Sequence, residues 1–93
     1  NVFPARVRAV LLEHPQVEAC AVRRMSAGEG ERLKAFVVAR AGTAPAALLP
    51  ELEAWVKERL TAPECPRGWT FGDRLPRDER GKLADWSIAP QAR

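Results

Sequence analysis

The stretch Leu33-Lys34-Ala35-Phe36-Val37-Val38-Ala39 decides how this chain folds. It is short and apolar and carries β-branched and aromatic residues, which is typical of a β-strand. Val17 to Met25, further upstream, starts with apolar residues at alternate positions and predicts another strand. The turn Ser26-Ala27-Gly28-Glu29-Gly30 is polar and contains glycine. The two strands are therefore predicted to pair antiparallel across it.

A helix is predicted on the N-terminal side of this strand pair. Pro4 suits the first turn of a helix, because that turn has no use for its missing N–H. The helix is expected to run to about His14, where His14-Pro15 stops it. Its apolar stripe would consist of Val7, Val10 and Leu11.

A second helix is predicted after the strand pair, from about Pro50, or a little earlier, to Leu60. One of its faces is charged and the other is apolar, which is the pattern of a helix that lies on a core. Pro63 and Pro66 break the pattern. The apolar positions are Leu48, Leu52, Trp55, Val56 and Leu60.

The remaining part of the chain predicts one more strand. Trp69-Thr70-Phe71 is the candidate, and one or two helical turns are expected over Ala84 to Ala89. The order helix, strand, strand, helix, strand predicts an α+β fold. Its small three-stranded, mostly antiparallel sheet would pack against helices on one face.

Size and composition predict one small globular domain over residues 1–93. Apolar residues make up 46% of the chain and charged residues 29%, unlike a disordered sequence. No apolar run is long enough to span a membrane, and no signal peptide is visible. The net charge of +3 is too small and too scattered for a nucleic-acid-binding surface. Because the first residue is Asn1 rather than Met, a fragment or processed product is expected.

The cysteines and tryptophans are expected to have structural roles. Cys20 and Cys65 lack the spacing of metal ligands, and the single His14 adds little, so no metal site is predicted. Reduced thiols, buried or half-buried, are expected rather than a disulfide, which suits a cytoplasmic protein. Cys20 would be a small core residue, and Trp55 and Trp69 would pack on the helix and the sheet.

The segment Leu75-Pro76-Arg77-Asp78-Glu79-Arg80-Gly81-Lys82-Leu83 carries most of the functional information. Pro76 favours an extended residue before it, and Gly81 permits a positive φ and the close approach of a ligand. Lys82 would then lie at the tip of a loop, where a flexible ammonium can meet a phosphate. A plain solvated turn is the alternative, since charged loops are common. A P-loop is excluded, because it needs two spaced glycines and a hydroxyl residue after the lysine.

Five motifs follow one another along nearly the whole chain: Asn1-Val2-Phe3-Pro4 with Val7-Arg8-Ala9-Val10-Leu11, His14-Pro15-Gln16-Val17 with Ala21-Val22, Lys34-Ala35-Phe36-Val37-Val38, Pro66 to Pro76, and Pro76 with Gly81-Lys82. In this order they resemble the small C-terminal domain of the adenylate-forming enzymes. That superfamily comprises acyl- and aryl-CoA synthetases, the amino-acid-activating domains of peptide synthetases, and luciferases.

The resemblance implies a lid that closes over a larger N-terminal domain, which binds ATP and a carboxylic acid. Lys82 matches the family lysine that reaches the carboxylate and the α-phosphate while the acyl-adenylate forms, where an ammonium stabilises the charge on the phosphate oxygens. The lid then rotates and presents its opposite face for thioester formation with CoA or a phosphopantetheine thiol. ATP, Mg²⁺ and CoA would be bound mainly by or with the N-terminal domain. The chain alone would be inactive.

Other residues receive lesser roles from the resemblance. Pro76 and Gly81 would shape the loop of Lys82. Arg67 and Arg77 are weaker candidates for binding the phosphates of CoA or the nucleotide, and a plain surface arginine is the alternative for both.

Three departures from the family pattern leave other functions open. Arg8 replaces a usual Glu, Asp78 replaces a usual Thr, and Leu83 is followed by Ala84-Asp85-Trp86 instead of a motif that ends in Arg. Asp78 and Asp85 add negative charge near an anionic ligand, which would lower catalytic efficiency. A non-catalytic interaction or regulatory module with the same fold would fit these departures. An adenylation domain that loads an acyl carrier protein is a further alternative, and an RNA-binding α+β domain is a distant one.

Overall fold

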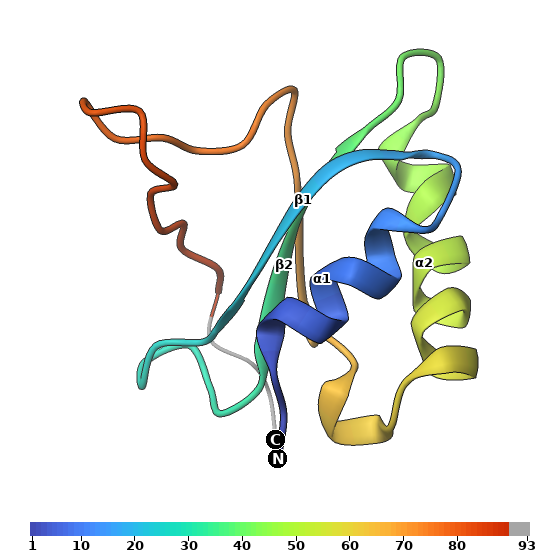
Figure 1. The fold of residues 1–93 in the computed structure, drawn as a ribbon, viewed down its shortest axis with the longest axis horizontal. Helices are drawn as coiled ribbons and strands as arrows, with labels where there is room; N and C mark the ends of the chain where they lie inside the picture. Colours follow the sequence, from blue (N-terminus) through green and yellow to red (C-terminus); the bar gives the residue numbers. More distant parts are fainter. Residues whose placement is uncertain (90–93) are drawn as a thin grey trace.

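The computed structural model describes residues 1–89, which form two α-helices, a short 3₁₀ helix and a three-stranded sheet (Figure 1). The helices and strands follow in the predicted order. Their bounds are α1 Pro4–Leu12, β1 Val17–Arg24, β2 Leu33–Ala39, α2 Pro45–Arg59, η1 Ala62–Glu64 and β3 Gly68–Phe71. Within residues 1–89, neither helix has the length and apolar character needed to cross a membrane.

The sheet has the strand order β1-β2-β3, with β2 in the middle. β1 and β2 pair antiparallel, as predicted, with Arg24 opposite Leu33. β3 runs parallel to β2, with Gly68 opposite Lys34. The parallel pairing arises because α2 lies between β2 and β3 in the chain, and a crossover of this kind returns the chain to the end where β2 began. The α+β class is confirmed, and the sheet is mixed.

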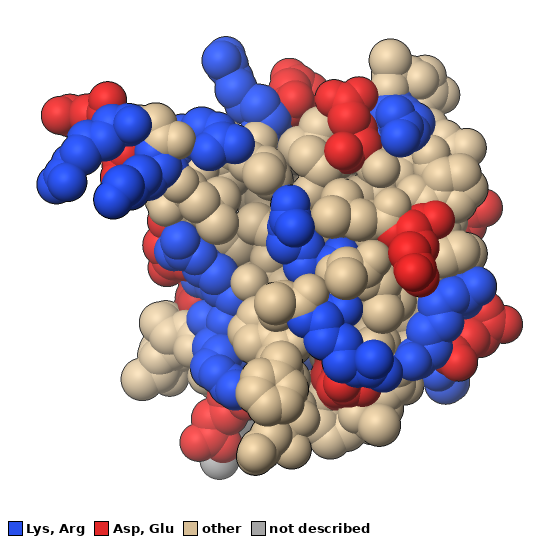
Figure 2. Space-filling model, viewed as in Figure 1, with Lys and Arg blue, Asp and Glu red and all other residues tan. Residues whose placement is uncertain are grey.

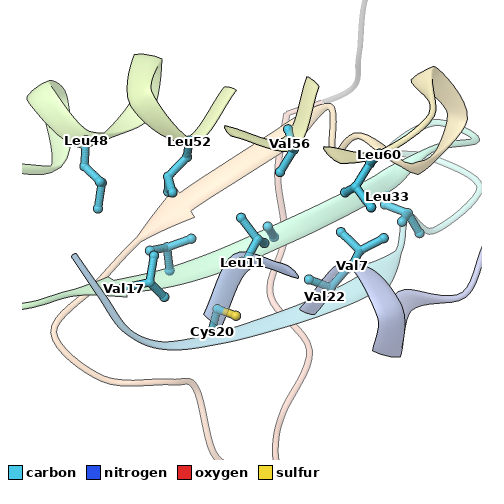
Figure 3. Packing of buried hydrophobic residues seen from close by; sticks show 12 residues of the cluster. Val7, Leu11, Val17, Cys20, Val22, Leu33, Leu48, Leu52, Val56 and Leu60 are labelled. Carbon is cyan, nitrogen blue, oxygen red and sulfur yellow. The ribbon is translucent and has the colours of Figure 1, made fainter. Parts of the chain in front are cut away.

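Both helices lie on the same face of the sheet, and the main core fills the space between them and the strands (Figure 1, Figure 3). From α1, the side chains of Val7 and Leu11 are fully buried. The helical spacing had predicted both of these positions. The other main members are Leu48, Leu52, Val56 and Leu60 from α2 and its end, and Val17, Cys20, Val22, Leu33, Ala35 and Val37 from the sheet.

The second helix begins earlier than predicted, at Pro45 rather than near Pro50. Pro45 occupies the first turn, where its missing N–H breaks no helical hydrogen bond. Pro50 lies inside the helix and removes one such bond. Leu48 and Leu52, on either side of this proline, are both fully buried. Their burial holds the turn helical across a residue that usually marks a helix boundary.

The other face of the sheet is covered by the C-terminal segment rather than by a helix (Figure 1). Trp86 is buried there and meets Phe36 edge to face, with the ring centroids 5.7 Å apart. Leu75 and Leu83 pack against the same small cluster. Trp86 thus packs the end of the chain on the sheet.

The helical turns predicted over residues 84–89 are wrong, because these residues are neither helix nor strand. Their backbone groups bond to side chains of the sheet and of the turn that joins β1 to β2. The carbonyl oxygen of Trp86 accepts a hydrogen bond from Lys34, and the N–H of Ile88 donates to Glu29. The N–H of Ile88, its only backbone donor, is thereby not available for a helical hydrogen bond.

The cysteines and the other two tryptophans have the structural roles predicted. Cys20 is fully buried in β1, and this burial, opposed only in part by the charge of Arg8, raises the pKa of its thiol to about 11. Cys65 is half-buried, and both thiols are free. Trp55 and Trp69 are half-buried and pack against the main core.

Leu11→Ala should destabilise the fold far more than Leu12→Ala, the matched control on the next residue of α1. Leu11 is fully buried, whereas Leu12 is 36% exposed. Truncating a buried leucine costs about 2–5 kcal/mol, and a surface change stays within about 0.5 kcal/mol. Urea unfolding followed by tryptophan fluorescence measures both, and equal costs would contradict this location of the core.

Candidate functional site

Residues 76–84 form a small hairpin that projects from the domain beyond the end of β3 (Figure 1). Arg77 and Leu83 pair as an isolated antiparallel bridge. The N–H of Ala84 donates to the carbonyl oxygen of Pro76 at 3.0 Å. We refer to residues 76–84 as the Lys82 hairpin.

Asp78 and Gly81 organise the turn of the Lys82 hairpin. The N–H of Asp78 donates to the carbonyl oxygen of Lys82 at 2.8 Å, and the N–H of Gly81 donates to that of Asp78 at 2.9 Å. Gly81 has a φ of +83°, a conformation that residues with a side chain rarely adopt. The Asp78 Oδ1 atom accepts from the backbone N–H groups of Arg80 at 2.8 Å and Lys82 at 3.0 Å. The carboxylate that departs from the family pattern thus stabilises the turn.

Lys82 is exposed on this turn, as predicted. Among residues 1–89, no hydrogen bond or ion pair engages its ammonium. Figure 2 shows basic side chains gathered over the projecting hairpin, with acidic side chains beside them. An unpartnered ammonium on a closed turn is suited to meet an anionic group such as a phosphate.

The structure brings only one of the two candidate arginines to Lys82. Arg77 lies in the same hairpin, where its Nη1 donates to the carbonyl oxygen of Gly81 at 3.1 Å and its other N–H groups remain available. Arg67 directly precedes β3 and therefore lies at the opposite end of that strand from the hairpin. Pro76 is half-buried at the base of the hairpin.

A hollow of about 480 Å³ lies at the base of the hairpin. Two arginines and three apolar residues line it, so it could hold an anionic group that is attached to an apolar part. The lining residues are Phe36, Arg74, Leu75, Pro76 and Arg77.

Lys34 is a buried lysine to which none of the sequence motifs assigned a functional role. Its side chain, on β2, is 0% exposed, and its Nζ donates to Glu29 Oε1 at 2.7 Å. The same ammonium lies 3.2 Å from Asp85 Oδ1 and donates to the backbone carbonyl oxygen of Trp86. A buried charge is tolerated only where such partners replace water. We refer to Lys34, Glu29, Asp85 and Trp86 as the Lys34 network.

The sequence did contain a signal for this network. Side chains two residues apart in a strand lie on the same face, so Lys34 shares its face with Phe36 and Val38, both buried. A lysine in such a series must find acidic or carbonyl partners beyond its own strand. The sequence does not specify which residues these partners are.

Glu29 reaches Lys34 from the turn between β1 and β2. Its Oε1 also accepts from the N–H of Ser26 at 2.9 Å, and its Oε2 accepts from the N–H of Ile88 at 2.8 Å. The hydrogen bond from Lys34, together with these two backbone bonds, lowers the pKa of Glu29 from 4.5 to about 2 despite its burial. The charged carboxylate joins the turn to the C-terminal segment.

Asp85 is the other acidic residue that departs from the family pattern, and it forms ion pairs with basic residues of the sheet. Arg23 Nη1 lies 3.4 Å from Asp85 Oδ1, and Arg23 Nη2 donates to the carbonyl oxygen of Leu83 at 3.1 Å. Burial opposes ionisation of Asp85, but the hydrogen bond and charge of Lys34 and the bond from Arg23 outweigh it, and the pKa of Asp85 is lowered. The negative charge at position 85 is therefore compensated within the chain.

No group of three or more His, Cys, Asp or Glu side chains within residues 1–89 is placed to hold a metal ion.

Residues 7–82 match the family model of the AMP-binding enzyme C-terminal domain. The chain belongs to this family. The match runs from α1 through the sheet to Lys82 and confirms the resemblance found in the sequence.

Relatives of this AMP-binding C-terminal domain are longer CoA ligases. The 4-coumarate–CoA ligase of Halorhodospira halophila is 45% identical over 84 residues, which are 89% of this chain and 22% of that protein. A crystal structure of a benzoate CoA ligase from Burkholderia xenovorans superposes with a TM-score of 0.73 at 38% identity, over 86% of this chain and 17% of the other.

The o-succinylbenzoate CoA synthetase of Bacillus subtilis, solved with its acyl-adenylate intermediate, gives a TM-score of 0.70 at 33% identity. That similarity covers 89% of this chain and 16% of the synthetase. This chain therefore spans less than a quarter of the length of each of these three proteins.

Glu29 should make the stability of the domain depend on pH in the acid range. Because the pKa of Glu29 falls from 4.5 to about 2 on folding, its contribution is fully present above pH 4.5 and is lost as the pH falls toward 2. The difference in free energy of unfolding between the wild type and Glu29→Gln should therefore shrink over this range. Urea unfolding at several pH values measures it.

Glu18→Gln is the matched control for this measurement, because Glu18 is an exposed glutamate on β1 that lies outside the Lys34 network. A difference between the wild type and Glu29→Gln that stays constant over the whole range would contradict the ion pair between Glu29 and Lys34.

Proposed function

We propose that this chain is the mobile C-terminal lid of an ATP-dependent acid–thiol ligase of the acyl- or aryl-CoA synthetase type. Residues 1–93 would form the lid, and a larger N-terminal adenylation domain of the same protein would bind ATP and the carboxylic acid. The family match and the names of the CoA ligases among the relatives support this proposal. The small share of each relative that the chain covers supports a larger partner domain.

Lys82 is the proposed catalytic residue. Attack of the carboxylate on the α-phosphate gathers negative charge on the phosphate oxygens, and an ammonium placed there stabilises that charge. The observation that carries the proposal is the exposed Lys82 ammonium, which has no partner within residues 1–89, on a turn closed by Asp78 and Gly81. An ammonium already held by a carboxylate would have to lose that partner before it could bind substrate.

The proposed cofactors fit the residues of this chain to different degrees. Lys82 and Arg77 would contact the phosphate groups of ATP, since both present N–H donors on the exposed hairpin. Residues 1–89 contain no acidic cluster that could bind Mg²⁺, so the ion would be held by another part of the protein. When bound, Mg²⁺ would neutralise phosphate charge. Arg67, at the far end of β3, is the candidate for a CoA phosphate in thioester formation.

Asp78 and Asp85, the two acidic residues that depart from the family pattern, are weaker support for a non-catalytic module once their contacts are considered. Asp78 accepts hydrogen bonds within the turn, and Asp85 pairs with Lys34 and Arg23. Both carboxylates therefore have structural partners.

The names of the relatives favour CoA over a carrier protein as the source of the thiol. A cytoplasmic location would suit the two free cysteines.

Lys82→Ala in the full-length protein should reduce ATP–pyrophosphate exchange, measured against a panel of carboxylic acids, by about 100-fold or more. Removal of a transition-state charge partner lowers the rate of adenylate formation, while the exposed position of Lys82 leaves folding intact. Lys57→Ala is the matched control, because Lys57 is an exposed lysine on α2. Exchange at the wild-type rate in Lys82→Ala would refute the role of Lys82.

A wild-type protein that is folded and shows no exchange with any acid would refute the ligase itself. That result would favour the interaction or regulatory module.

A further inference from the structure

Within residues 1–89, no hydrogen bond joins the tip of the Lys82 hairpin, residues 77–82, to the rest of the domain. Within the described residues, every hydrogen bond of residues 77–82 joins two members of the hairpin. Its direction relative to the sheet is therefore set by the stretches of chain on either side of it. The stretch before the tip leaves β3 at Phe71, and the stretch after the tip begins at Leu83.

The stretch after the tip is fixed to the sheet at Leu83, Asp85 and Trp86. The carbonyl oxygen of Leu83 accepts from Arg23, the carboxylate of Asp85 meets Arg23 and Lys34, and the carbonyl oxygen of Trp86 accepts from Lys34. Two of these three attachments involve the Lys34 ammonium. The first residue held by Lys34, Asp85, lies only three positions after Lys82.

Lys34 is well placed to act as a fixed point. It lies on β2, the central strand, and its ammonium also bonds Glu29 at 2.7 Å. A fully buried ammonium that loses a partner is left partly unsatisfied, which costs far more than at the surface. The Lys34 network therefore resists displacement of Asp85 and Trp86. The ring of Trp86 adds to this, since its centroid is 5.1 Å from the same ammonium.

We propose that Lys34, held by Glu29, is a positioning residue for Lys82. It fixes Asp85 and Trp86 to the sheet and thereby sets where the Lys82 ammonium lies when the adenylate forms. This inference rests on the proposed function. Lys34 is 0% exposed, so it does not touch the substrate itself.

The first test compares Lys34→Met with the wild type in the two half-reactions of the full-length protein. Methionine keeps the unbranched, apolar stem and removes the charge. Adenylate formation, followed by ATP–pyrophosphate exchange, should slow by about 10- to 100-fold in kcat, because small misplacements of a reacting group have effects of this size. The KM for ATP should change less. Thioester formation from supplied acyl-adenylate and CoA should stay close to the wild-type rate.

Asp85→Asn is the second variant, because the Asp85 side chain is 57% exposed and asparagine keeps an oxygen acceptor, so the domain is expected to stay folded. It should show the same selective defect, in smaller measure, even where Lys34→Met does not fold. An equal loss in both half-reactions, or adenylation at the wild-type rate in the folded variants, would overturn the inference. If the folded variants adenylate at the wild-type rate but Lys82→Ala adenylates slowly, the proposed function still holds. Wild-type exchange in Lys82→Ala would refute the proposed function instead.

Limited trypsin digestion provides a readout that needs no activity. The hairpin contains three trypsin sites, at Arg77, Arg80 and Lys82, and α2 contains two exposed ones, at Lys57 and Arg59. In Lys34→Met and Asp85→Asn, cleavage in the hairpin should become several-fold faster, while cleavage in α2 keeps its rate. Equal acceleration at both places would mean that the whole domain loosens, and would overturn the inference.

Discussion

The arrangement of this domain depends on the burial of one ammonium, that of Lys34. The helices cover one face of the sheet, and the other face is closed by a C-terminal segment without regular structure. That segment stays in place because Lys34 holds Asp85 and Trp86, and because Glu29 receives the N–H of Ile88. Each partner replaces water around a buried charge, so the contacts stabilise the segment only when they are made together.

Two lysines in this chain illustrate opposite uses of the same side chain. Lys34 is fully buried and has oxygen partners on three residues, whereas Lys82 is exposed and has none among residues 1–89. The first arrangement gives rigidity, and the second leaves a charge available for a ligand. The nearby carboxylates of Asp78 and Asp85 are engaged in the turn and the network. In the account proposed here, a rigid buried lysine supports a free exposed one.

Local patterns predicted the elements that pack on the main core. The burial of Leu11 follows from the face of the helix that it occupies, and Val37 lies in a strand marked by its apolar, β-branched residues. Pro76 and Gly81 likewise predicted an exposed turn, since their backbone preferences are local. Residues 84–89 could not be placed in the same way. Their conformation follows from bonds to side chains far away in the sequence, of which Lys34 provides the main one. The parallel pairing of β3 also depends on the path of a crossover, which local patterns do not encode.

Backbone hydrogen–deuterium exchange in the wild type and Lys34→Met tests the central claim most directly. The amides to follow are those of Ala84, at the base of the hairpin, and Ile88, which donates to Glu29. Both amides are expected to exchange at least about 10-fold faster in the variant, while the amide of Val37 in the central strand keeps its protection. Unchanged exchange at Ala84 and Ile88 in a folded Lys34→Met protein would contradict the claim that Lys34 holds this segment.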